Sequence, residues 1–103
     1  MIAKDLLRNS RAFEKAPLAV NILAAREGTL AERLTAAWLE LGMLTGRPLP
    51  EEFQERYDYM HALATEKGSY EQSIAGLEAE DAQNLARLMV AFALDVAAAM
   101  SQG

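Results

Sequence analysis

The sequence contains no cysteine, so disulfide bonds and thiolate metal sites are excluded. It has one histidine, His61, which excludes a metal site built from several imidazoles. The 10 Lys and Arg residues are outnumbered by 15 Asp and Glu, and they are scattered along the chain. Nucleic-acid-binding surfaces need clustered basic residues, so this balance argues against a nucleic-acid partner. We predict no metal and no cofactor.

Long apolar runs and strand patterns are also missing. The longest nearly uncharged run, Leu88 to Met100, has 13 residues and includes Asp95, whereas a membrane-spanning helix needs about 20. The N-terminal residues lack the apolar core of a signal peptide. No segment alternates apolar and polar residues in the manner of a strand. We therefore expect a cytoplasmic protein without a membrane segment.

All the apolar periodicity that is present is helical. It predicts helices over about residues 3–15, 17–27, 29–45, 50–65 and 79–101, with a short helical turn capped by Ser69. Pro17 is expected to break the first helix or start the second, whose apolar side carries Leu18, Ile22 and Ala25. Thr29 and Glu32 have the spacing of a capping box. The predicted fold class is all-α: one domain over residues 1–103, a bundle of about five helices with a long C-terminal helix.

The C-terminal helix is apolar on two sides. At 100° per residue, a broad core stripe carries Leu85, Leu88, Met89, Phe92, Val96, Ala99 and Met100. The far side, where a surface helix should be polar, carries Val90, Ala91, Leu94 and Ala97. Either this helix is wrapped by the rest of the bundle, or its second face meets another subunit.

We favour a homodimer, because two-fold dimers are the commonest assembly of soluble proteins. The helix predicted after Thr29 repeats the two-sided pattern more weakly. The residues predicted to form the interface are Trp38, Leu39, Met43, Val90, Leu94 and Ala97. Asp95 is the only charge in the apolar run, and we expect it to pair with an arginine from another helix; the alternative is a polar group in a pocket.

The stretch RPLPEEFQERYDYMHALAT holds the chain's candidate catalytic residues. Arg56-x4-His61 resembles the pattern of HEPN ribonucleases, in which an arginine and a histidine four to six residues apart act across a dimer. That resemblance implies an RNA-cleaving or toxin–antitoxin function through Arg56 and His61. The sequence departs from the pattern in having Tyr57 after the arginine and the motif in mid-chain. Without the resemblance, Arg56 has Glu52 one turn away as an ion-pair partner, and His61 follows Asp58 by one turn.

A second resemblance covers roughly the C-terminal half. LPEEFQERYDYMHALAT, followed by a polar loop and LEAEDAQNLARLM, looks like small bacterial all-helical proteins with a Leu-Pro-x-Glu helix before an acid-capped helix. It implies a bacterial, cytosolic origin and carries no known activity.

The function predicted from the sequence is a protein-interaction or regulatory module, acting as a homodimer and not as an enzyme. The first alternative is the HEPN-like ribonuclease. The second is a bundle that binds a small apolar ligand among Met43, Met60, Met89 and Met100.

Overall fold

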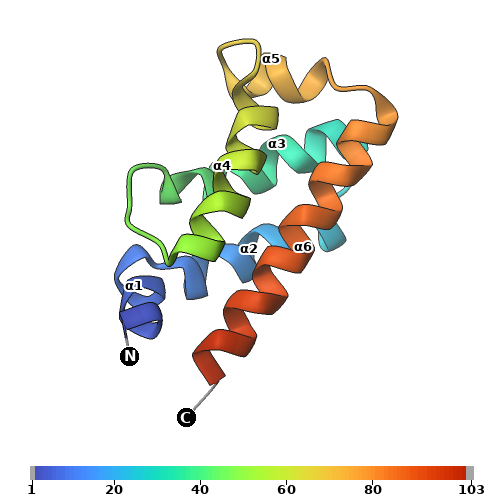
Figure 1. The fold of residues 1–103 in the computed structure, drawn as a ribbon. Helices are drawn as coiled ribbons and strands as arrows, with labels where there is room; N and C mark the ends of the chain where they lie inside the picture. The colour runs from blue at the N-terminus through green and yellow to red at the C-terminus, as the bar shows by residue number, and fades with distance from the viewer. Residues whose placement is uncertain (1, 102–103) are drawn as a thin grey trace.

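Six α-helices make up most of the chain in a computed structural model, which describes residues 2–101 (Figure 1). No strand occurs among these residues. This confirms the all-α class and the long C-terminal helix. The short turn after Ser69 is a helix of its own, so the bundle has six helices instead of about five. The elements are α1 (Ile2–Ser10), α2 (Ala12–Ala25), α3 (Leu30–Leu41), the 3-10 turn η1 (Gly42–Leu44), α4 (Glu51–Thr65), α5 (Tyr70–Ala75) and α6 (Ala79–Ser101).

The helix ends depend on local caps, which the sequence predicted correctly at two places. Before α3, the Glu32 amide donates to Thr29 Oγ1 at 3.1 Å and the Thr29 amide donates to Glu32 Oε1 at 2.9 Å. The hydrogen bond from the Thr29 backbone is the main cause that lowers the pKa of the Glu32 carboxyl. Before α5, Ser69 Oγ accepts from the Gln72 amide at 3.2 Å. These bonds satisfy amides that have no partner inside the helix.

The prediction that the first helix breaks at Pro17 was wrong. The break lies at Arg11, which adopts the left-handed backbone conformation with φ 68°, and Pro17 lies inside α2. Ser10 makes this tight turn possible, because its hydroxyl donates to the Leu7 carbonyl and accepts from the Ala12 amide. Arg47 adds a link from the loop before α4 by donating to the Ser10 carbonyl at 3.1 Å.

The helix α2 is buried along a stripe of small residues, and not along the side predicted from its larger ones. Ala12, Ala16, Ala19 and Leu23 are buried, whereas Leu18 and Ala25 are exposed and Ile22 is half-buried. Alanines leave room for close helix neighbours, and α2 packs chiefly against α3 and α6. This stripe therefore leaves Leu18 on the outside of α2, while Val20 and Ile22 pack against the edge of the core.

The core draws buried residues from all six helices, and α2, α3, α4 and α6 contribute most of them. The 23 residues of α6, at 1.5 Å each, give it a length of about 34 Å. It packs chiefly against α2 and also contacts α4, α3 and α1 (Figure 1). Its inner face is anchored by Phe92, whose ring meets Phe53 of α4 edge-on at a centroid distance of 5.7 Å. The predicted core stripe of α6 is mostly confirmed: Leu85, Met89, Phe92 and Val96 are buried, while Leu88, Ala99 and Met100 are half-buried.

Candidate functional site

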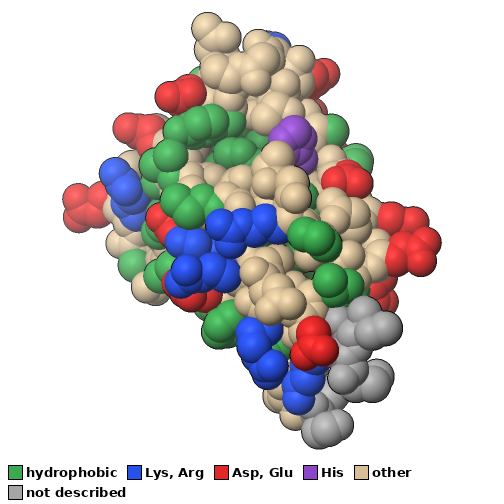
Figure 2. All heavy atoms as spheres, turned by 90° about the vertical axis from the view of Figure 1, so that its left-hand side faces the viewer, with side chains coloured by type: hydrophobic (Ala, Val, Ile, Leu, Met, Phe, Trp, Pro, Cys, Tyr) green, Lys and Arg blue, Asp and Glu red, His purple; other side chains and the backbone are tan. Residues whose placement is uncertain are grey.

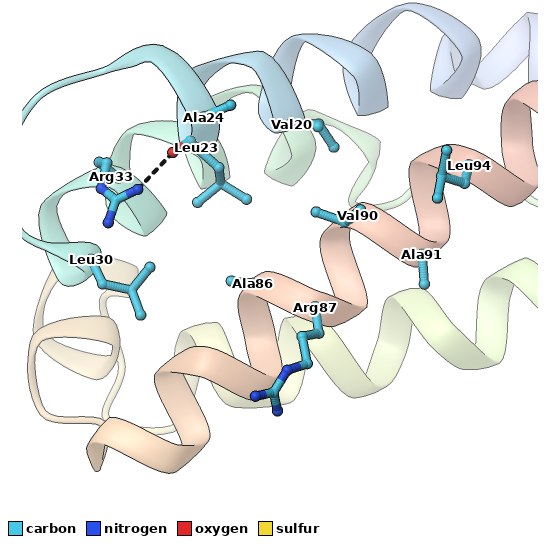
Figure 3. Close-up of a pocket in the computed structure, with 10 residues that line it drawn as sticks. All are labelled: Val20, Leu23, Ala24, Leu30, Arg33, Ala86, Arg87, Val90, Ala91 and Leu94. Atoms are coloured by element: carbon cyan, nitrogen blue, oxygen red, sulfur yellow. Dashed lines mark hydrogen bonds between the residues drawn. The ribbon is translucent and has the colours of Figure 1, made fainter.

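An apolar groove runs between α2 and α6. It consists of two adjoining hollows, one of about 480 Å³ that also touches the start of α3, and one of about 860 Å³ further along. Both hollows are lined by Val20, Ala24, Val90 and Leu94, so they form one continuous surface. Figure 3 shows the first hollow, with Leu23 and Val90 pointing into the space between the two helices. We call this surface the α2–α6 groove.

The lining residues show that α2 and α6 run antiparallel along the groove. The larger hollow joins Glu14 and Pro17 from the first half of α2 to Ala97 of α6. The smaller hollow joins Leu23, near the end of α2, to Ala86 in the first half of α6. One end of the groove therefore combines early α2 with late α6, and the other end combines late α2 with early α6.

The walls of the groove carry large apolar side chains that the chain itself leaves exposed. Leu94 is 66% exposed, Leu18 is 42% exposed and Val90 is 38% exposed. Within residues 2–101, α6 is thus not wrapped on all sides. Its second apolar face, which the sequence identified, is one wall of the α2–α6 groove.

The six residues predicted for the interface fall into three places. Val90, Leu94 and Ala97 line the groove. Leu39 and Met43 are about half exposed, at 51% and 49%, but line neither hollow. Trp38 is only 4% exposed and stacks on Tyr57 with a centroid distance of 5.7 Å. Trp38 therefore belongs to the core and adds nothing to the exposed surface of the chain.

Sequence reasoning missed the wall contributed by α2, which consists of Pro17, Leu18, Val20, Asn21 and Ala24. The available signal was the 4-3-4 spacing of Ala12, Ala16, Ala19 and Leu23, which is a complete core stripe by itself. Because alanine is only weakly hydrophobic, the sequence pattern favours the larger residues beside it as the inner face.

The two ends of the groove carry opposite charges. At one end, Arg33 Nη1 donates to the Leu23 carbonyl at 2.8 Å, and its buried Nε has no hydrogen-bond partner among residues 2–101. Arg87 is exposed at the same end, and its guanidinium makes no ion pair or hydrogen bond within the described part of the chain. At the other end lies Glu14, whose carboxylate accepts from Arg11 at 2.7 Å. That hydrogen bond is the main cause that lowers the pKa of Glu14.

The candidate catalytic pair is divided between opposite flanks of α4. Arg56 faces α6, where its Nη1 lies 2.6 Å from Asp95 Oδ2 and its guanidinium lies over the Phe92 ring, 5.8 Å from the centroid. His61 faces α3, with its ring 6.1 Å from that of Trp38. Figure 2 shows the single histidine at the surface, separate from the Lys and Arg side chains gathered nearer the centre of that face. The chain by itself does not bring Arg56 and His61 together.

The ion pair of Arg56 confirms the prediction that Asp95 pairs with an arginine from another helix. It also shows that Arg56 binds across helices, and not to Glu52 one turn before it on α4. Asp58 accepts from Gln54 at 2.9 Å, so this carboxylate is engaged along the helix as well. Among residues 2–101, no group of three or more His, Cys, Asp or Glu side chains is placed to hold a metal ion.

Other uses of the molecule have less support from its geometry. Met60 and Met89 are buried in the core and Met43 is exposed, and none of the four methionines of the predicted ligand site lines the groove. By length and composition, α6 could cross a membrane, but the core helix of a soluble protein meets the same criteria.

No family model, curated protein or solved structure matches the chain.

Proposed function

We propose that this protein is a cytoplasmic interaction module that acts as a homodimer, with the α2–α6 groove as its contact surface. The observation that carries the proposal is Leu94, a large apolar side chain that is 66% exposed beside an apolar groove. Contiguous exposed apolar surfaces on small soluble domains mark interaction sites. Helices that lay an apolar face into such a groove are a common mode of recognition.

A second copy of the chain is the simplest partner with the required chemistry. In each copy the outer face of α6 is apolar and exposed. The α6 of a second copy therefore supplies a helix face of the same apolar character to cover it. Burying a leucine contributes about 1.5–3 kcal/mol, and a two-fold interface repeats each contact. The Arg56–Asp95 pair and the buried inner face of α6 favour a bundle helix over a membrane-spanning one.

Light scattering tests the proposal directly. We expect the wild-type protein at micromolar concentration to have twice the chain mass of 11.3 kDa. Leu94→Glu should give a monomer with an unchanged helical circular dichroism spectrum, because a charge on an exposed residue blocks association without entering the core. Leu39→Glu is the matched control: it is an exposed leucine that lines neither hollow, and it should remain dimeric. A monomeric wild type overturns the proposal.

A flotation assay with anionic phospholipid vesicles tests the other class of partner. We expect the wild-type protein to stay in the soluble fraction, since the groove is to be filled by a helix of the second copy. Flotation with the vesicles that Leu94→Glu abolishes would show that the groove meets a lipid surface, and would overturn the assignment to a protein partner.

The ribonuclease alternative has weaker support, because Arg56 is engaged with Asp95 and His61 lies on the other flank of α4. His61→Ala separates the two functions. In an interaction module this variant keeps its dimeric mass. In a nuclease it remains folded but loses RNA cleavage that the wild type shows.

A further inference from the structure

We infer that the second copy binds in one register: the two α6 helices run antiparallel and cross at Leu94, so that Arg87 of each copy meets Glu14 of the other. This inference rests on the proposed homodimer and adds the direction, the crossing point and the charge pair. It follows from the outer face of α6, from the antiparallel course of α2 beside it, and from the opposite charges at the two ends of the α2–α6 groove.

The outer face of α6 has the spacing of a helix–helix seam. Arg87, Ala91, Leu94, Ala98 and Ser101 follow one another at intervals of 4, 3, 4 and 3, and all five are exposed. This is the a/d spacing of helices that pack along their length. One large residue stands in the middle with small ones on both sides. A second α6 can therefore approach closely and place its own leucine beside the first.

A two-fold axis at Leu94 exchanges positions that lie equally far along α6 on either side. Arg87 and Ser101 are each seven residues from Leu94, so Arg87 of one copy lies opposite Ser101 of the other. Glu14 lies at this end of the groove, in the same hollow as Ala97. The partner's Arg87 is thereby brought to the end of the groove that carries the carboxylate of Glu14.

The charges favour this direction over its reverse. Arg87 has no ion-pair or hydrogen-bond partner among residues 2–101, and α6 has no basic residue in its last turn. Antiparallel packing brings each Arg87 to the Glu14 carboxylate, which then lies between Arg11 of its own chain and the incoming Arg87, and to the negative end of the partner's helix dipole. Parallel packing would place the two Arg87 side chains next to each other, and like charges facing each other across an interface are unfavourable.

Single cysteines test the crossing point, because the chain has none of its own. Leu94→Cys should form a disulfide-linked dimer under mild oxidation, since the axis brings the two positions together. Arg87→Cys should not form one. The two copies of position 87 lie on opposite sides of the axis, seven residues from it in each direction, which places them about 21 Å apart at 1.5 Å per residue. A disulfide needs Cα atoms within about 7 Å. An antiparallel register thus crosslinks through position 94 alone, whereas a parallel one crosslinks through both positions.

Charge exchange tests the pair between Arg87 and Glu14. Arg87→Glu should weaken dimerisation about tenfold, because it replaces two attractions by two repulsions. The double variant Arg87→Glu, Glu14→Arg should recover most of the lost affinity, since the pair is re-formed with its signs reversed. Recovery stays incomplete because Glu14→Arg also removes the ion pair with Arg11. Arg26→Glu is the matched control, an exposed arginine that lines neither hollow, and it should leave the affinity unchanged. Circular dichroism checks that every variant is folded.

The outcomes separate the inference from the proposed function. A monomeric wild type overturns both. A dimer that crosslinks through Arg87→Cys, or that fails to crosslink through Leu94→Cys, overturns the register and leaves the homodimer standing. Crosslinking through Leu94→Cys without rescue by the double charge exchange overturns the Arg87–Glu14 pair.

Discussion

The two sides of α6 are both apolar, but the fold treats them in opposite ways. On the inner side, Phe92 is fully buried against Phe53 and Tyr57. On the outer side, two residues further on, Leu94 is 66% exposed in the α2–α6 groove. An apolar helix face thus shows a need for burial without showing what buries it. For one face the neighbours come from the same chain, and for the other we propose a second copy.

The largest effect is expected from Phe92→Ala on the inner face. Removing a fully buried aromatic ring leaves a cavity beside Phe53 and Tyr57 and lowers the free energy of unfolding by about 3–5 kcal/mol. Urea denaturation followed by circular dichroism measures the change. A loss below about 1 kcal/mol would contradict the assignment of Phe92 to the centre of the core.

A smaller effect is expected where α4 supports the inner face. The Tyr57 hydroxyl lies 2.7 Å from Thr45 Oγ1 and 3.2 Å from the Leu41 carbonyl oxygen, to which it donates. Tyr57→Phe keeps the ring but leaves this carbonyl without its donor, so we expect a loss of about 1–2 kcal/mol in the free energy of unfolding. Tyr59→Phe, at an exposed position of the same helix, is the control and should change little.

The same hydroxyl predicts how stability depends on alkaline pH. Burial is the main cause that raises the pKa of Tyr57 above its ordinary value of 10.0. Below pH 10 the phenol is protonated in both the folded and unfolded chain, so the contribution of the Tyr57 hydroxyl to the free energy of unfolding is fully present. It is lost as the pH rises above 10 and through the pKa of the folded protein, because only the unfolded chain then releases the proton readily. Tyr57→Phe should lack this pH-dependent part of the free energy of unfolding. If that free energy falls with the same slope above pH 10 in wild type and variant, the role given to the Tyr57 hydroxyl is contradicted.

A slight effect is expected at the border between the two faces. Asp95 is more than half exposed, so its ion pair with Arg56 is screened by solvent. Asp95→Asn should lower the free energy of unfolding by about 0.5 kcal/mol, and added salt should reduce the difference from the wild type. A double-mutant cycle that combines Asp95→Asn with Arg56→Gln isolates the interaction between the two side chains. A coupling free energy above about 2 kcal/mol would mean that the pair is part of the core.

The smallest effect on the fold is expected on the outer face. Leu94→Glu should change the free energy of unfolding of the monomer by no more than about 0.5 kcal/mol, because the side chain is mostly in water. The measurement is made in dilute solution, where wild type and variant are both monomeric. A loss comparable with that of Phe92→Ala would show that the two faces of α6 do not differ in their support of the fold.

Much of the local structure was predictable from the sequence. The limits of α6, the Thr29–Glu32 capping box and the Ser69 cap depend on residues within one or two turns of each other. The break between α1 and α2 was equally local but was missed. Its signal is Ser10 beside an arginine in a left-handed conformation, and such a turn is less apparent in a sequence than a proline.

The candidate site was predictable only in part. Val90, Leu94 and Ala97 were identified from the periodicity of a single helix, and their exposure follows from the fold. The opposite wall was not identified, because Pro17 and Leu18 line a groove only when α2 runs antiparallel beside α6. In the same way, Asp95 was expected to find an arginine, but Arg56 could be named only once α4 and α6 were packed together.

The sequence alone determined the helical class, most helix ends and the presence of two apolar faces on α6, since these follow from spacings of three and four residues and from capping side chains. The tertiary structure decided which of the two faces is buried and placed Trp38 in the core beside Tyr57. It also separated Arg56 from His61 and paired α2 with α6 to form a groove with opposite charges at its ends. The physical reason is that periodicity places a residue on a helix face, whereas the neighbour of that face is selected by packing among segments far apart in the chain.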